Sequence, residues 1–123
     1  LTIEHWFSTQ PGADGGQVLV DTVPDGRDDY GLVTPVGGYT GPLRSGSCNP
    51  LQGQPAFYGR SGGWITSRFD LTRFRGRLVY LAFVFGSDNV GSRNEGWYVD
   101  KVVLETTRPG EPSCSAASRT APR

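Results

Sequence analysis

Short runs of alternating apolar and polar residues recur along this chain, and glycine- or proline-rich turn sequences separate them. A two-residue period is typical of strands with one buried face, and no window shows a convincing 3.6-residue period. Eighteen glycines and nine prolines among 123 residues supply the turns. The pattern predicts an all-β fold with strands at Leu1–Phe7, Gln17–Thr22, Tyr30–Thr34, Pro55–Gly59, Gly63–Phe69, Leu78–Phe85 and Trp97–Glu105.

The phase of three strands predicts which side chains face the core. In the first strand, Leu1, Ile3, His5 and Phe7 form the inward set. Leu78–Phe85 is apolar in both phases, so we expect a central strand covered on both faces. Residues upstream of Leu1 would supply that cover, and we interpret the chain as part of a longer protein. In the last strand we expect the inward set to be Tyr98, Asp100, Val102 and Leu104.

The strands predict one domain, an antiparallel two-sheet β-sandwich over residues 1–106. Residues 36–54 are expected to form a long irregular loop, and residues 70–77 a compact bend. The Pro/Ser-rich composition of residues 107–123 predicts a linker or disordered tail.

Charge and apolar content narrow the classes of partner. Lysine plus arginine balance aspartate plus glutamate at 12 each, which argues against nucleic acid because phosphate binding needs a cationic surplus. No apolar run approaches the roughly 20 residues of a membrane span. Cys48 and Cys114 could pair or stay reduced, and a disulfide would indicate an oxidising compartment.

An ordered series of short motifs carries a family resemblance. The series resembles the MAM-like jelly-roll domain that accompanies secreted bacterial peptidases of the immune inhibitor A type, and cleaved-adhesin modules are similar. The matching residues are His5-Trp6-Phe7, Asp14-Gly15-Gly16, Gly37-Gly38-Tyr39, Ala56-Phe57-Tyr58-Gly59, Trp64, Asp70-Leu71, Gly76, Gly86-Ser87-Asp88 and Gly96-Trp97-Tyr98-Val99-Asp100.

The resemblance implies a galactose-binding-like jelly roll in a secreted, extracellular protein. Two departures from the family pattern matter. Strands that usually precede the His-Trp segment are absent, and Lys101 stands where a second aspartate often follows Asp100. The implied function is a non-catalytic accessory module for adhesion, substrate docking or structural support.

No motif for catalysis is present. The single histidine, His5, lies in the inward phase, where it is expected to be a hydrogen-bonded packing residue rather than a general base. Cys48 lies in a loop with no basic partner implied, and Asp28-Asp29 is typical of an exposed turn. A hydrolase would need a second catalytic group that the sequence does not offer.

Calcium is the cofactor that the resemblance implies, since jelly rolls of this kind often hold one where the first hairpin meets the last strand. The matching positions are Asp14 and Asp100, with Asp88 as a third. Calcium takes six to eight oxygen ligands from carboxylates and loop carbonyls. The alternatives are that Asp14 shapes a turn, that Asp100 accepts backbone N–H bonds, or that His5 is the partner of Asp100.

Aromatic residues are the candidates for ligand contact. Tyr39, Trp64 and Trp97 are predicted binding residues, with the loop 36–54 around Tyr39 and Cys48 as the recognition surface. Packing inside the sandwich is the alternative role for these rings. The expected partner is an extracellular protein or a glycan, and a carbohydrate-binding module of a secreted hydrolase is the alternative function.

Overall fold

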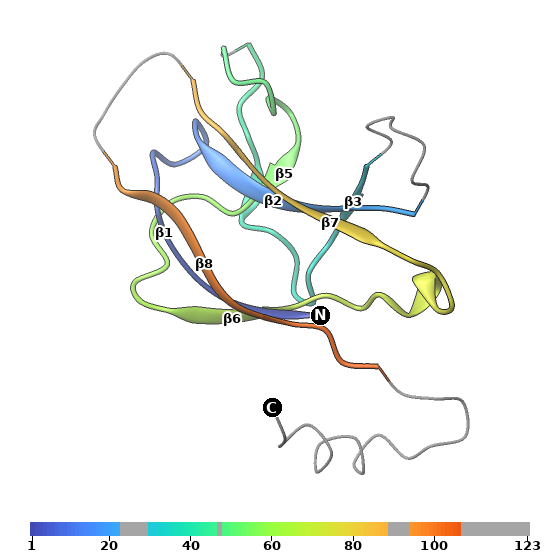
Figure 1. Cartoon of the computed structure of the whole chain (residues 1–123). Helices are drawn as coiled ribbons and strands as arrows, with labels where there is room; N and C mark the ends of the chain where they lie inside the picture. Colours follow the sequence, from blue (N-terminus) through green and yellow to red (C-terminus); the bar gives the residue numbers. More distant parts are fainter. Residues whose placement is uncertain (23–29, 47, 89–93, 107–123) are drawn as a thin grey trace.

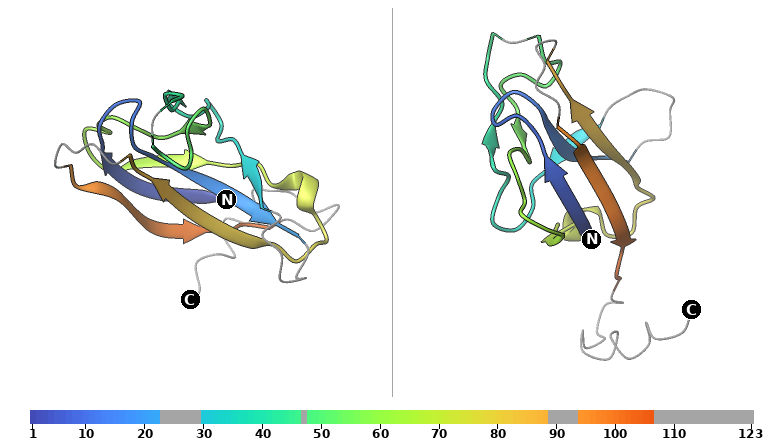
Figure 2. Two further views of the ribbon diagram at one scale, coloured as in Figure 1. Left: turned by 90° about the horizontal axis from the view of Figure 1, so that it is seen from above. Right: turned by 90° about the vertical axis from the view of Figure 1, so that its left-hand side faces the viewer.

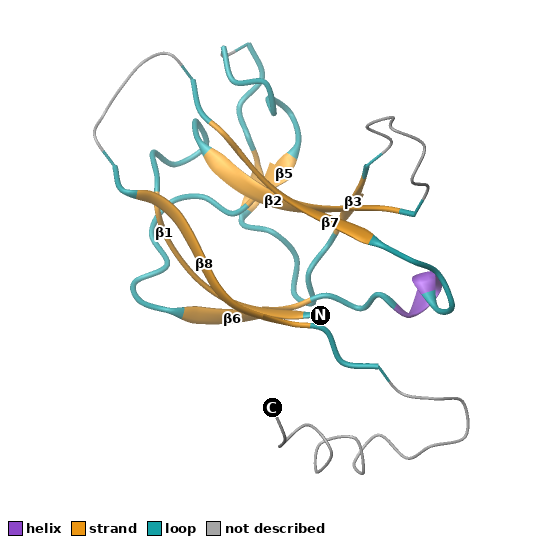
Figure 3. Ribbon diagram, viewed as in Figure 1, coloured by secondary structure: helices purple, strands orange, loops and turns teal. Residues whose placement is uncertain are grey.

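The computed structural model describes residues 1–22, 30–46, 48–88 and 94–106. These residues form strands and a single short 3-10 turn, Thr72–Phe74, shown in purple in Figure 3. The strands are β1 Thr2–Ser8, β2 Gly15–Asp21, β3 Gly31–Val33, β4 Gly41–Pro42, β5 Pro55–Ala56, β6 Ile65–Arg68, β7 Tyr80–Gly86 and β8 Gly96–Val103. The predicted all-β class is confirmed, and each predicted strand is present with shifted or shortened ends.

Two three-stranded antiparallel sheets form the layers of a β-sandwich (Figure 1). One sheet has the order β6-β1-β8 and the other β3-β2-β7, while β4 and β5 pair separately. Figure 2 shows β7 and β8 on the same flank of the molecule. The finer jelly-roll and galactose-binding-like assignments stay predictions.

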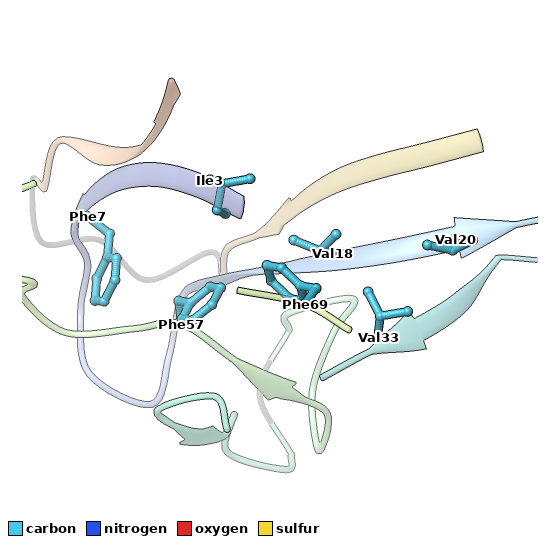
Figure 4. Packing of buried hydrophobic residues seen from close by; sticks show 7 residues of the cluster. All are labelled: Ile3, Phe7, Val18, Val20, Val33, Phe57 and Phe69. Atoms are coloured by element: carbon cyan, nitrogen blue, oxygen red, sulfur yellow. The ribbon is translucent and has the colours of Figure 1, made fainter. Parts of the chain in front are cut away.

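The core lies between the two sheets, as Figure 4 shows. The predicted inward phase of β1 is confirmed, because Ile3, His5 and Phe7 are buried and the residues between them are more exposed. Facing them are Val18 and Val20 from β2. The buried cluster consists of Ile3, Phe7, Val18, Val20, Val33, Phe57 and Phe69.

The strand covered on both faces is β2, and the prediction of a central strand at Leu78–Phe85 is wrong for the described residues. β2 lies between β3 and β7, so β7 ends its sheet. Gln17 and Asp21, on the outward phase of β2, are both nearly fully buried, and the Gln17 amide donates to the Pro55 carbonyl over 3.1 Å. Apolar composition therefore did not identify the central strand, because buried polar side chains occupy one of its faces.

The inward phase predicted for β8 is also wrong. Register pairs His5 with Val99 and Phe7 with Trp97, and paired residues share a face. Trp97 and Val99 therefore point inward, while Asp100 and Tyr98 are exposed on the outer face. A register shift and the positive φ of Lys101 (45°) then mark a bulge, beyond which Val102 and Leu104 are 46% and 49% exposed.

Candidate binding sites

Trp97, a predicted ligand-binding residue, is partly buried and packs against the core. Its indole Nε1 donates to His5 Nδ1 over 3.0 Å, and His5 Nε2 lies 2.8 Å from Ser67 Oγ. Because Nδ1 accepts, the imidazole proton belongs on Nε2 and is donated to Ser67. The Phe57 ring lies 4.6 Å from the imidazole. Burial lowers the pKa of His5 from 6.5 to about 4. The predicted packing role of His5 is confirmed, and its predicted alternative pairing with Asp100 is wrong.

The Trp97 ring also requires glycine at position 16. A Cβ on Gly16 would lie 2.3 Å from Trp97 Cε3, closer than any real contact. Trp97 is further in ring contact with Phe57 and Phe83, each 6.2 Å away between centroids. The side chain therefore links β8 in one sheet to β2 and β7 in the other.

Tyr39, the second predicted binding residue, holds the loop after β3 in place. Its hydroxyl accepts from the Val18 backbone N–H over 3.0 Å and donates to the Val33 carbonyl. Its ring lies 4.7 Å from Phe57. Burial raises the pKa of Tyr39 to about 12. A hydroxyl committed to two strands in this way is placed to support the sandwich rather than to meet a ligand.

Trp64, the third predicted residue, lies on the surface and is 56% exposed. It directly precedes β6. Trp6, on the outer face of β1, is paired with Tyr98, and their ring centroids lie 5.6 Å apart at an interplanar angle of 50°. We refer to Trp6 and Tyr98, together with Trp64 at the start of β6, as the aromatic row. The alternation of β1 already placed Trp6 on this face.

Two of the three predicted calcium ligands come together. Asp14 Oδ1 accepts the backbone N–H of Asp88 over 3.0 Å, which joins the turn before β2 to the segment after β7. Asp100 does not join them, because it is exposed beside Glu4 and its Oδ1 accepts the Lys101 N–H over 2.8 Å.

Three oxygens around Asp14, including its Oδ1, already accept hydrogen bonds from the protein. The carbonyl of Ala13 accepts from Asn49 Nδ2, and that of Asp14 from Thr9 Oγ1. Within the described ranges, no three His, Cys, Asp or Glu side chains gather as a metal site. The side chains of Asp14 and Asp88 alone do not supply the six to eight oxygens that calcium takes, and a bound calcium stays a prediction.

The predicted disulfide involves one residue outside the described part of the chain. Cys48 is exposed in the turn that follows β4. Cys114 lies outside the described residues, as do Asp28 and Asp29. The pairing of Cys48 with Cys114 stays a prediction.

An apolar groove of about 590 Å³ opens at the end of the sandwich where Leu1 and Thr106 lie. The large apolar residues that line it are Leu1, Phe69, Leu71, Phe74, Val79 and Leu104. Phe69 is buried in the core, so the groove reaches the inter-sheet space. The sequence signal that could have indicated this groove is the bend 70–77, in which Leu71 and Phe74 lie among three arginines.

Two arginines and two acids are among the residues that line the groove. Arg75 and Arg77 line it, and the guanidinium of Arg73 lies 4.8 Å from the centre of the Phe74 ring. Residues 60–77 hold five arginines and one acid, Asp70. The Asp70 carboxylate accepts from the Thr72 hydroxyl and N–H, which lowers its pKa. Glu105 is the other acid in the lining.

The chain is similar to the pre-pro-metalloprotease PrtV of Vibrio cholerae serotype O1, in strains M66-2 and ATCC 39315 / El Tor Inaba N16961. In both cases 33% of 105 aligned residues are identical, which covers 85% of this chain and 10% of the relative. The chain thus spans about a tenth of the length of these relatives. No family model and no solved structure matches. Among the residues that the structure describes, no helix has the length and apolarity of a membrane span.

Proposed function

We propose that this chain is a non-catalytic accessory module of a secreted bacterial peptidase, and that it docks an extended polypeptide in the groove at the Leu1 end. Similarity to a segment of a metalloprotease precursor supports the link to a peptidase. The MAM-like assignment made from the motif series is part of this proposal. Its extracellular placement follows the same relatives, whose name describes a pre-pro form.

The groove is the observation that carries the docking role. A volume of about 590 Å³ lies in the range of pockets that hold small ligands or short peptide segments. Its apolar lining suits side chains such as leucine. Arg75 and Arg77 in the lining suit carboxylates, because the Asp70 carboxylate is already hydrogen-bonded to Thr72. An extended peptide that alternates apolar and acidic residues matches both. Such a segment can belong to a substrate protein held near the catalytic part.

Binding of labelled peptides tests this role. We expect a fluorescein-labelled peptide of alternating leucine and glutamate to bind the 123-residue chain, with a rise in anisotropy that saturates. A matched peptide of alternating leucine and lysine should bind at least about tenfold more weakly, because it presents cations to the arginines. Leu104→Lys, in the groove, should weaken binding about tenfold. Leu78→Lys is the control, since Leu78 is 67% exposed and outside the groove lining.

Charge reversal separates specific docking from adhesion of a sticky surface. Arg75→Glu should weaken binding of the leucine–glutamate peptide. Arg60→Glu, which changes an arginine outside the groove lining, should leave the affinity for that peptide unchanged. Equal affinity for both peptides, or an unchanged affinity in Leu104→Lys, would rule out the groove as the docking site.

The aromatic row supports a second candidate, a carbohydrate-binding module. Trp64 and Tyr98 are 56% and 49% exposed on a sheet face, where pyranose rings can stack. Titration with soluble glycans should then quench tryptophan fluorescence with saturation, and Tyr98→Ala should abolish the effect. Absence of saturable quenching by a panel of glycans would rule out the carbohydrate-binding role, and peptide docking would be the remaining candidate.

A further inference from the structure

A second, smaller hollow of about 290 Å³ lies next to the groove at the Leu1 end of the sandwich. Four residues line both hollows, and we call them the rim: Leu1, Phe69, Asp70 and Glu105. The remaining lining of the smaller hollow, which we call the outer pocket, consists of Thr2, Val36, Arg68 and Val103. Because half of its lining is shared with the groove, the two hollows are contiguous.

The outer pocket and the groove lie on opposite sides of the end of the β6-β1-β8 sheet. Thr2 is on the outward phase of β1 and is paired with Arg68 and with Val103, so these three residues share the outer face. Leu71 and Phe74 of the groove instead pack against the core between the sheets. The rim is therefore the sheet end itself, and Figure 1 shows the N-terminus there beside the ends of β6 and β8.

The apolar side chains of the outer pocket are open to solvent. Val36 is 72% exposed and Val103 is 44% exposed. The backbone N–H of Val36 donates to the Arg68 carbonyl over 2.7 Å, which holds Val36 against the end of β6. The three charged side chains in the lining are one arginine and two acids, so they do not favour an anion. The valines favour an uncharged aliphatic side chain, because covering them removes apolar surface from water.

We propose that the outer pocket is a second subsite of the docking site, and that it takes an aliphatic side chain adjacent in sequence to the residue anchored in the groove. This inference rests on the peptide-docking role proposed above. Successive side chains of an extended peptide point to opposite sides of its backbone. A peptide that lies along the rim therefore places one side chain in the groove and the next in the outer pocket.

The two subsites together define the sequence that the chain docks. An alternating leucine–glutamate peptide can fill the groove, but it presents a carboxylate to the outer pocket, where Glu105 is part of the lining. A peptide in which one glutamate is replaced by valine can fill both hollows. The preferred segment is therefore one with two adjacent aliphatic residues flanked by acidic ones.

Anisotropy titrations of the 123-residue chain with three labelled peptides test the second subsite. One peptide alternates leucine and glutamate, and in the other two the central glutamate is replaced by valine or by serine. We expect the valine peptide to bind about tenfold more tightly than the glutamate peptide, since one more aliphatic side chain is buried. The serine peptide should bind like the glutamate peptide, because serine has no comparable apolar surface.

A matched pair of variants assigns the higher affinity to the outer pocket. Val36→Asp should remove the advantage of the valine peptide and leave the affinity for the glutamate peptide within about twofold of the parent chain. Leu78→Asp introduces the same charge at a residue that is 67% exposed and outside both linings. This control should retain the whole advantage. Circular dichroism of both variants confirms that the changes in affinity do not reflect a loss of fold.

The outcomes separate the second subsite from the docking role. If none of the three peptides binds, both the docking role and the second subsite are overturned. If the glutamate and valine peptides bind equally, or if the advantage of valine persists in Val36→Asp, the docking role stands and the second subsite is overturned. Equal tightening by serine and by valine also overturns it, because the effect then reflects the loss of a charge on the peptide.

Discussion

Trp97→Ala is expected to lower the free energy of unfolding by about 3 kcal/mol, measured by urea denaturation at pH 7. The change removes the ring that packs on Gly16 and contacts Phe57 and Phe83, so contact between the two sheets is lost. It also leaves His5 Nδ1 without its 3.0 Å donor inside the core. A buried acceptor without a donor adds about 1 kcal/mol or more to the cost of the cavity.

Trp64→Ala is the matched control, because the same ring is removed from a site that is 56% exposed. Its effect on the free energy of unfolding should stay within about 0.5 kcal/mol. If Trp97→Ala does not fold, Trp97→Phe retains most of the packing and isolates the loss of the indole N–H. Equal effects of the two alanine variants would contradict the assignment of Trp97 to the core.

Acidification from pH 7 to pH 4 is expected to remove about 3 kcal/mol of stability through His5 alone. The folded-state pKa is about 4, below the unfolded value of 6.5, so the unfolded chain binds the proton more tightly. The contribution of neutral His5 to the free energy of unfolding is therefore complete above pH 6.5. It is lost progressively as the pH falls toward 4, and the loss levels off below that. At pH 5 the loss should be about 2 kcal/mol. The cause is burial of the imidazole among aromatic rings, with both ring nitrogens already engaged.

His5→Gln isolates this effect from the titration of carboxylates. Glutamine retains a hydrogen-bond donor and acceptor but does not titrate in this range. The stability difference between the parent chain and the variant should shrink by about 3 kcal/mol between pH 7 and pH 4. Because the chain has one histidine, NMR titration of its imidazole reports the same pKa directly. A folded-state pKa near 6.5 would contradict the buried, neutral state.

The positions of most strands could be predicted from local sequence, whereas the inward face of β8 could not. β1 alternates apolar and polar residues so strictly that Ile3, His5 and Phe7 define the buried face without knowledge of partners. In β8 both phases contain large apolar side chains, so either face could be buried. Pairing with β1 decided the outcome, because Trp97 lies opposite Phe7 and Val99 opposite His5. Asp100 was thereby directed to the outer face.

The candidate sites show the same division. Trp64 was predicted as a binding residue, but the contact between Trp6 and Tyr98 on the same sheet depends on the pairing of β1 with β8. Asp14 and Asp88 were both singled out, yet the hydrogen bond between them depends on the pairing of Gly15 with Gly86. The groove was missed because its walls come from the two ends of the described chain and from the bend between β6 and β7.

The sequence by itself determined the all-β class, the inward phase of β1 and the packing role of its single histidine. These depend on local alternation and turn composition, which act over a few residues. Only the tertiary structure decided that β2 rather than β7 is the central strand, and that Trp97 rather than Asp100 faces the core. Strand order and register are set by contacts between residues far apart in the chain, and shifting a strand by one residue exchanges its two faces.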